Sequence, residues 1–173
     1  MAINLKIELA GDEQLNRTLG LILEGVNDLR PAFVDMSKEL NSYHKAVFAN
    51  EGQHGGNQKW APLKEKTLQR KKNKKILNET GTLRGSFTSD SADGAIRVIK
   101  KLLFQWGSST PYAGYHQTGT RNMPKRSPLR FNDRLRRRMV KIVQKYYFDF
   151  LKASANGNLG KLSSLKAKSR TGL

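Results

Sequence analysis

The side chains that could support acid–base or metal chemistry are few, and their spacing does not form an active site. The histidines are His44, His54 and His116, and the chain has no cysteine. No two histidines have the spacing of a helical or finger-type metal site, so support for a metal is weak. A metal-free ribonuclease could use His54 and His116 as acid and base. We expect no catalytic residue, no metal and no cofactor.

The glycines near the middle of the chain do not form a phosphate-binding loop. Three of them lie between residues 52 and 56, around His54. They match no GxxxxGK[ST] pattern and follow no expected strand. The Thr80-Gly81 pair likewise matches no nucleotide-binding loop. His44 falls on an expected helix beside apolar residues, where we predict a surface or half-buried side chain.

Electric charge is the strongest feature of the composition. Lys and Arg total 32 against 14 Asp and Glu, which gives a net charge of +18. Residues 1–51 hold 5 basic and 8 acidic residues, whereas residues 52–173 hold 27 and 6. A balance this basic suggests a polyanionic partner, either nucleic acid or an acidic protein surface. The alternative is a solvated basic surface or a disordered basic tail.

Two segments concentrate the basic residues. Residues 64–75, which include Lys71 and Lys72, cannot form a core and would be a solvated face, a mobile loop or a polyanion contact. Residues 125–145 place four cations on one expected helix face, at spacings of three and four: Arg134, Arg137, Arg138 and Lys141. That stripe could follow phosphates, or it could dock on the acidic first fifty residues of a neighbouring subunit. A solvated helix face is equally consistent with it.

The elements that would position these residues begin with an alternating segment. Residues 2–9 place apolar side chains on one face, which predicts a strand. Apolar residues then recur at helical spacing over residues 12–29. Pro31 suits the first turn of a second helix that runs to about Ala49, or a kink in one long helix. The glycine-rich residues 50–58 predict a loop.

The middle of the chain predicts several short helices and strands. We expect a brief helix near Thr67 and a turn or helical piece around residues 77–84. Residues 86–107 resemble a β-meander with strands at 86–89, 95–100 and 102–106. Asp93-Gly94 would then form a hairpin turn. Trp106, at the end of this run, is expected in the core, whereas core and contact roles are balanced for Trp60.

The C-terminal part returns to helical periodicity. Residues 108–130 predict an irregular connection with one helical turn at residues 112–117. Asn132 or Asp133 can cap a final helix that ends near Ala155. Residues 156–173 contain many Gly, Ser and Lys and no acid, so we expect a flexible basic tail.

Together these elements predict the α+β class: a small antiparallel β-sheet packed against long helices, with extended loops. A length of 173 residues suits one domain, which we place at residues 1–155, followed by the tail at residues 156–173. The sequence contains no run of 18 apolar residues, so we expect no membrane span. The N-terminus has no signal-peptide pattern, and the lack of cysteine fits a cytosolic origin.

Four short motifs follow one another in a fixed order, at residues 56–67, 77–86, 112–119 and 123–129. This series resembles the phage virion morphogenesis family, also called tail-completion or neck proteins, and the resemblance spans roughly residues 45–150. Lys125 departs from the pattern, since a small residue is expected there. The motif residues that we single out are Trp60, Pro62, Leu63, Thr80, Gly81, Leu83, Arg84, Tyr112, His116, Gln117, Gly119, Pro124 and Arg126.

These motif residues have physical roles that need no catalysis. Gly81 and Gly119 suit tight turns or a positive φ. Arg126 can fork onto a carboxylate, in its own subunit or in the next. His116 and Gln117 can satisfy loop backbone groups. The sequence leaves two roles open for these residues. They could hold loops in place within the monomer, or they could contact a neighbouring subunit.

The resemblance implies a structural, non-enzymatic virion component that is added during assembly in the host cytoplasm. It implies a homo-oligomeric ring, expected to be a hexamer, around the DNA channel at the neck. The partners would be the head connector and the tail-tube or tail-terminator proteins, with DNA contact possible and no membrane. The alternative is a monomeric basic nucleic-acid-binding protein that uses residues 64–75 and 125–145.

Overall fold

The structure is a computed structural model that describes residues 20, 23, 25 and 27–155. The predicted strand at residues 2–9, most of the helix at residues 12–29 and the tail at residues 156–173 lie outside the described residues. Among the elements described, none is a helix long and apolar enough to cross a membrane.

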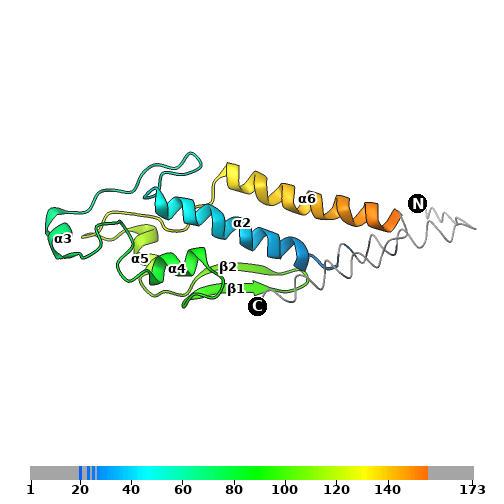
Figure 1. Cartoon of the computed structure of the whole chain (residues 1–173), viewed down its shortest axis with the longest axis horizontal. Helices are drawn as coiled ribbons and strands as arrows, with labels where there is room; N and C mark the ends of the chain where they lie inside the picture. Colours follow the sequence, from blue (N-terminus) through cyan, green and yellow to red (C-terminus); the bar gives the residue numbers. More distant parts are fainter. Residues whose placement is uncertain (1–19, 21–22, 24, 26, 156–173) are drawn as a thin grey trace, which may run out of the picture.

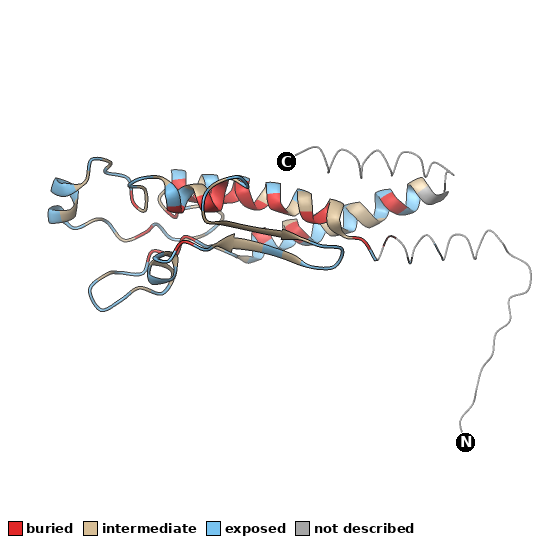
Figure 2. Ribbon diagram, turned by 90° about the horizontal axis from the view of Figure 1, so that it is seen from below, coloured by how far each residue is buried: buried red, intermediate tan, exposed pale blue. Residues whose placement is uncertain are grey.

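The central element is helix α2, Arg30–Ala49, which begins with Pro31 in its first turn as predicted. It contacts helix α6 on one side and helix α4 with strand β1 on the other (Figure 1). Because neighbours cover it on both sides, it buries residues around much of its circumference, as the red segments of Figure 2 show. The helix ends at Asn50, whose backbone N–H donates to the Ala46 carbonyl.

Helix α6, Asp133–Ala155, confirms the predicted final helix and its N-terminal cap. The Asn132 side-chain oxygen accepts the backbone N–H of Leu135 at 2.9 Å, which satisfies one of the free donors of the first turn. Leu135 and Met139 are buried in the core cluster shared with α2. At the other end, the Tyr146 hydroxyl donates to the Asp28 carbonyl at 2.7 Å.

The sheet is a two-stranded antiparallel hairpin of β1, Ala95–Ile99, and β2, Phe104–Ser108. Its register pairs Arg97 with Trp106. The second and third predicted strands are thus confirmed, as is the α+β class. The turn between them lies at residues 100–103, where the Lys100 N–H donates to the Leu103 carbonyl.

The prediction of a strand at residues 86–89, the first of the expected β-meander, is wrong. Most of this segment belongs to helix α4, Thr82–Thr88. The helix places Leu83 and Phe87, one turn apart, in the core beside α2, which explains why alternation over four residues was misleading. Asp93-Gly94 therefore does not join two strands, and it connects α4 to β1 instead, with Gly94 at φ +76°.

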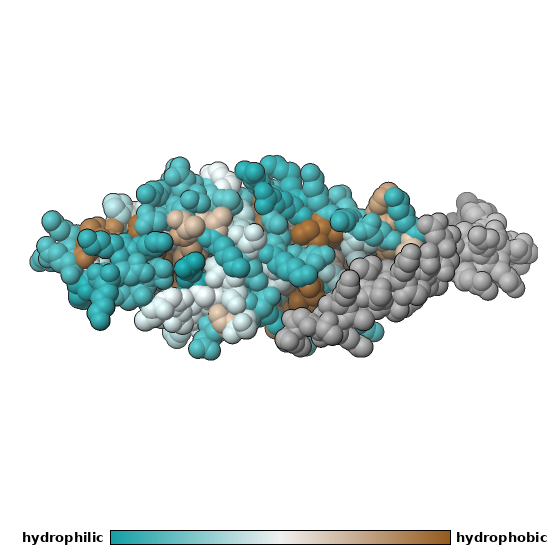
Figure 3. Space-filling model, viewed as in Figure 1, coloured by the Kyte–Doolittle hydropathy of each residue, from teal (hydrophilic) through white to brown (hydrophobic). Residues whose placement is uncertain are grey.

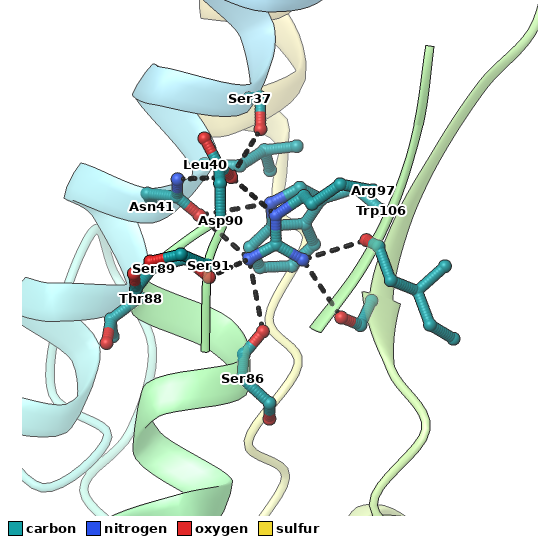
Figure 4. Close-up of polar contacts among 12 residues, drawn as sticks. Ser37, Leu40, Asn41, Ser86, Thr88, Ser89, Asp90, Ser91, Arg97 and Trp106 are labelled. Carbon is teal, nitrogen blue, oxygen red and sulfur yellow. Dashed lines mark hydrogen bonds and ion pairs between the residues drawn. The ribbon is translucent and has the colours of Figure 1, made fainter. Parts of the chain in front are cut away.

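Arg97 fastens the hairpin to α2 and to the end of α4 (Figure 4). Its Nε donates to Asp90 at 2.7 Å, and its Nη2 donates to the Asn41 side chain at 3.0 Å. The guanidinium also lies 4.6 Å from the centre of the Trp106 ring. Asn41 in turn accepts the Trp106 Nε1–H at 3.2 Å. One charged residue thus joins three elements that are far apart in sequence.

Burial determines the protonation behaviour of this cluster. Burial lowers the pKa of Arg97, although Asp90 opposes that effect. Burial also tends to raise the pKa of Asp90, but hydrogen bonds from Asn41, Arg97 and Ser37 lower it below its usual value. Asp90 and Arg97 are therefore a charged pair at neutral pH.

His44 corrects a second prediction, because its exposed fraction is 0% rather than that of a surface or half-buried residue. Its Nδ1–H donates to the Leu40 carbonyl at 2.8 Å, and its Nε2 accepts the Arg130 backbone N–H at 3.2 Å. With both nitrogens satisfied, the neutral ring can lie in the core. Burial lowers its pKa to about 4.

The remaining elements are short helices at one end of the molecule. Helix α3, Glu65–Arg70, and helix α5, Ala113–Thr118, confirm the predicted brief helix and helical turn. Neither buries a residue fully, whereas Trp60 and Trp106 belong to or pack against the core cluster. The predicted loop at residues 50–58 is also confirmed.

Candidate functional site

The motif segments, distant in sequence, converge on one hollow that is lined by residues of α3, the start of α4 and α5. Figure 1 shows these three helices towards the same end of the molecule. We call it the motif hollow, and its volume is about 540 Å³. Part of the predicted motif set lines it: Leu63, Thr80, Gly81, Leu83, Tyr112, His116, Pro124 and Arg126. The convergence gives these scattered residues a common location.

Arg126 forms the link between two walls of the motif hollow. Its Nε donates to the Ala61 carbonyl and its Nη2 to the Pro62 carbonyl, each at 2.7 Å. Its own N–H donates to the His116 carbonyl at 3.0 Å. The expected carboxylate partner within the same subunit is absent among the described residues, and two backbone carbonyls take its place. Burial lowers the pKa of Arg126.

The side chains of His116 and Gln117 differ in whether they hydrogen-bond to the backbone of the loop. The Gln117 amide donates to the Leu129 carbonyl and accepts the Leu129 N–H, both at 3.1 Å, which confirms the predicted loop-holding role. The His116 Nδ1 is buried without a hydrogen-bond partner in the described structure. Burial, assisted by the positive charge of Arg126, lowers the pKa of His116.

Trp60 and Gly119 hold the chain around the motif hollow without lining it. The Trp60 Nε1–H donates to the Ser127 carbonyl at 3.1 Å, and the indole ring is buried, which favours the core role. Gly119 has φ +82°, and a Cβ there would lie 3.0 Å from the Lys125 backbone nitrogen. Gly81 has φ +90° where α4 begins. Both predicted positive-φ glycines are confirmed.

Some of the other motif residues line the floor of the motif hollow, and others are exposed to solvent. Leu83 is buried and Leu63 half-buried, so they form part of an apolar floor. Tyr112 and Arg84 are exposed. The Thr80 hydroxyl lies 2.9 Å from the Thr82 hydroxyl, at the entrance to α4.

Basic residues that were not in the predicted motif set surround the motif hollow. Lys64 and Arg70 are exposed at its rim, from the basic segment at residues 64–75. Lys71 is largely buried, donates to the Lys75 carbonyl at 2.7 Å, and pairs with Glu79 at 3.3 Å. It therefore helps to hold its own loop. Lys72 is exposed and does not line the hollow.

The cations of α6 form a second basic region. Arg134, Arg137 and Lys141 are exposed, and no described acid lies within ion-pairing distance of them. Arg138 differs, because it pairs with Glu39 of α2 at 2.6 Å. Four arginines near the N-terminus of α6, at positions 134, 136, 137 and 138, oppose the helix dipole. Their interaction with the helix dipole destabilises the isolated fold, and an anionic partner would offset this cost.

The described His, Asp and Glu side chains do not gather in one place in the structure. Within the described part of the chain, no group of His, Asp and Glu could hold a metal ion. His54 packs edge-on against Tyr43, with ring centres 4.8 Å apart, and does not line the motif hollow with His116. The hollow combines an apolar floor with several cations and one carboxylate, Glu79, which Lys71 already pairs. The excess of positive charge suits an anionic group attached to an apolar one.

The sequence profile of the phage virion morphogenesis family matches residues 10–147. The chain belongs to this family. Its members serve the assembly of the phage virion, so this protein is a virion component with a structural or assembly role. The match is wider than the motif resemblance at residues 45–150 and includes the α2 region. No curated protein and no solved structure matches the chain.

Proposed function

We propose that this protein is a subunit of a ring at the head–tail junction, where it joins the tail to the head connector during assembly. Membership of the phage virion morphogenesis family carries the proposal. The ring would be a homo-oligomer, and the family resemblance implies a hexamer. It would contact the head connector and the tail-tube or tail-terminator proteins. It would surround the DNA channel.

Exposed apolar side chains on two different faces support assembly into a ring. Phe148 is 57% exposed on the outer side of α6, with Val140 and Leu151 also exposed. Leu102 is 63% exposed at the tip of the hairpin, on the other side of α2, and Leu103 adjoins it. Figure 3 shows such patches separated by hydrophilic surface. Two unlike faces on one subunit can form a head-to-tail contact, which closes into a ring.

The N-terminal part of the exposed side of α6, which precedes Phe148 and Leu151, is our candidate for contact with DNA in the channel. Its exposed cations, Arg134, Arg137 and Lys141, have no described acidic partner, and Arg134 in the first turn also opposes the helix dipole. Contacts of this kind bind phosphates without reading sequence. A monomeric nucleic-acid-binding protein is the second candidate, and the same cations favour it.

A phage in which this gene is inactivated tests the proposal. We expect infected cells to accumulate filled heads and complete tails that do not join, and a plasmid copy of the gene should restore joined particles. Electron microscopy of the lysate measures the fraction of joined particles. Normal joining without the protein would reject the ring and favour the nucleic-acid-binding alternative.

A further inference from the structure

The motif hollow contains a buried positive charge that has no counter-ion. Arg126 is 6% exposed, and no described carboxylate lies within ion-pairing distance of it. Its Nε and Nη2 donate to the Ala61 and Pro62 carbonyls, whereas no described atom accepts a hydrogen bond from Nη1. A buried cation without a paired anion is costly, and proteins usually supply one.

A second polar group in the same wall is also unsatisfied. His116 lines the motif hollow next to Arg126, and its buried Nδ1 has no partner among the described residues. A neutral imidazole carries one N–H, which can be presented at Nδ1. Arg126 therefore has an N–H available for one oxygen of an incoming carboxylate, and a rotation of the neighbouring His116 ring would bring its buried Nδ1 to the second oxygen.

The rest of the motif hollow restricts the chemistry of the occupant. Leu63, Leu77 and Met123 contribute apolar surface, and Lys64 and Arg70 stand at the rim. A volume of about 540 Å³ is far larger than a single anion needs. The occupant should therefore carry apolar side chains together with carboxylates, which describes an acidic peptide segment better than a nucleic-acid backbone.

We propose that the motif hollow is a docking site for an acidic, apolar-containing peptide segment of a different protein, with one carboxylate held by Arg126 and His116. The proposal does not depend on where the ring lies in the virion. It goes beyond the joining role because it assigns a specific site and a chemical class of partner.

Among the residues that the structure describes, the acidic N-terminal part of a second copy is a poor source of that segment. The described acids of its acidic N-terminal part each pair with a base of their own chain: Asp28 with Arg30, Asp35 with Lys38, Glu39 with Arg138 and Glu51 with Lys59. These carboxylates already have partners, so they do not form a free acidic surface. A protein with unpaired acids is the better match.

The test is an NMR titration of the full-length chain with two model peptides. The first is N-acetylated, C-amidated Glu-Leu-Glu-Leu-Glu, and the second has Gln in place of each Glu. We expect the acidic peptide to shift the Arg126 side-chain Nε–H and the backbone amides of residues 63–71, 77–83 and 112–126. The Gln peptide should produce no comparable shifts, because it has no carboxylate.

A pair of charge-reversal variants localises the binding without removing Arg126. Lys64→Glu with Arg70→Glu changes exposed rim residues, so the fold should survive, and the affinity should fall about tenfold. Lys45→Glu with Lys100→Glu alters the net charge equally at exposed positions outside the motif hollow, and it should keep the wild-type affinity. Both sets of variants should unfold at temperatures near that of the wild type.

Four results would overturn the proposal. Equal shifts with both peptides would remove the carboxylate requirement. An equal loss of affinity in both charge-reversal variants would reduce the effect to net charge. Displacement of the acidic peptide by inorganic phosphate or by a twelve-residue oligothymidine at similar concentration would assign the hollow to phosphates instead. Concentration-dependent self-association that blocks the acidic peptide would assign it to a second copy.

Discussion

Acidification should destabilise this protein through His44. The ring is buried with both nitrogens hydrogen-bonded, and its pKa is lowered to about 4 from 6.5. The unfolded chain therefore binds a proton at His44 more readily than the folded chain does. The stability that the neutral ring provides is present above pH 6.5, and it is lost as the pH falls towards 4.

The size of this effect follows from the two pKa values. A difference of about 2.5 units corresponds to roughly 3 kcal/mol at most, and about 2 kcal/mol of it should be lost between pH 7 and pH 5. For a chain of this length, that change lowers the melting temperature by about 4–8 °C. Asp90, whose pKa is lowered from 3.8, titrates below this window and does not contribute to it.

Urea unfolding followed by tryptophan fluorescence at pH 7, 6 and 5 measures the loss. A His44→Gln variant should be less stable at pH 7 but nearly independent of pH across this range, because Gln does not titrate. A His116→Gln variant is the matched control and should keep most of the wild-type loss. If the wild type lost less than about 0.5 kcal/mol, or if His44→Gln kept the full slope, the buried neutral histidine would be refuted.

Three further changes test other parts of the structure. Arg97→Lys should lower the free energy of unfolding by about 3 kcal/mol, because Lys cannot bond Asp90, Asn41 and two carbonyls at the end of α4 together, and chemical denaturation measures this. Asp90→Asn, which keeps the shape, should cost less than Arg97→Lys, and a larger loss would contradict this ranking. Gly119→Ala should cost about 2 kcal/mol, because φ is +82° and the new Cβ would approach the Lys125 nitrogen, whereas Gly114→Ala meets no atom and should be tolerated. Replacing Arg134, Arg137 and Lys141 by Gln should reduce the salt slope of DNA binding by about 2–3, measured by fluorescence anisotropy, and an unchanged slope would remove α6 from the DNA contact.

Periodicity in the sequence was sufficient to predict the long helices. Apolar residues at spacings of three and four extend through α2 and α6. Pro31 in the first turn of α2 and the N-cap Asn132 of α6 indicate where each begins. The strand expected at residues 86–89 failed because four residues fit alternation and helical spacing equally well. There, packing of Phe87 against α2 decides for the helix.

The site was predictable only in part. Motif order identified Arg126, His116 and the two positive-φ glycines, but not the hollow that they line. Lys64 and Arg70 lay in a basic segment whose only local feature is charge, so their position at the rim depends on tertiary structure. Arg97 gave no local indication of its role, because its partners Asn41 and Asp90 lie on other segments.

Cryo-electron microscopy of the neck in intact virions tests the central claim most directly. The account predicts a closed ring of this protein between the head connector and the tail, with α6 facing the channel and the motif hollow occupied by an acidic segment of an adjoining protein. A particle whose neck lacks this protein would contradict the ring. A ring in which α6 faces away from the DNA would keep the joining role but reject the proposed DNA contact.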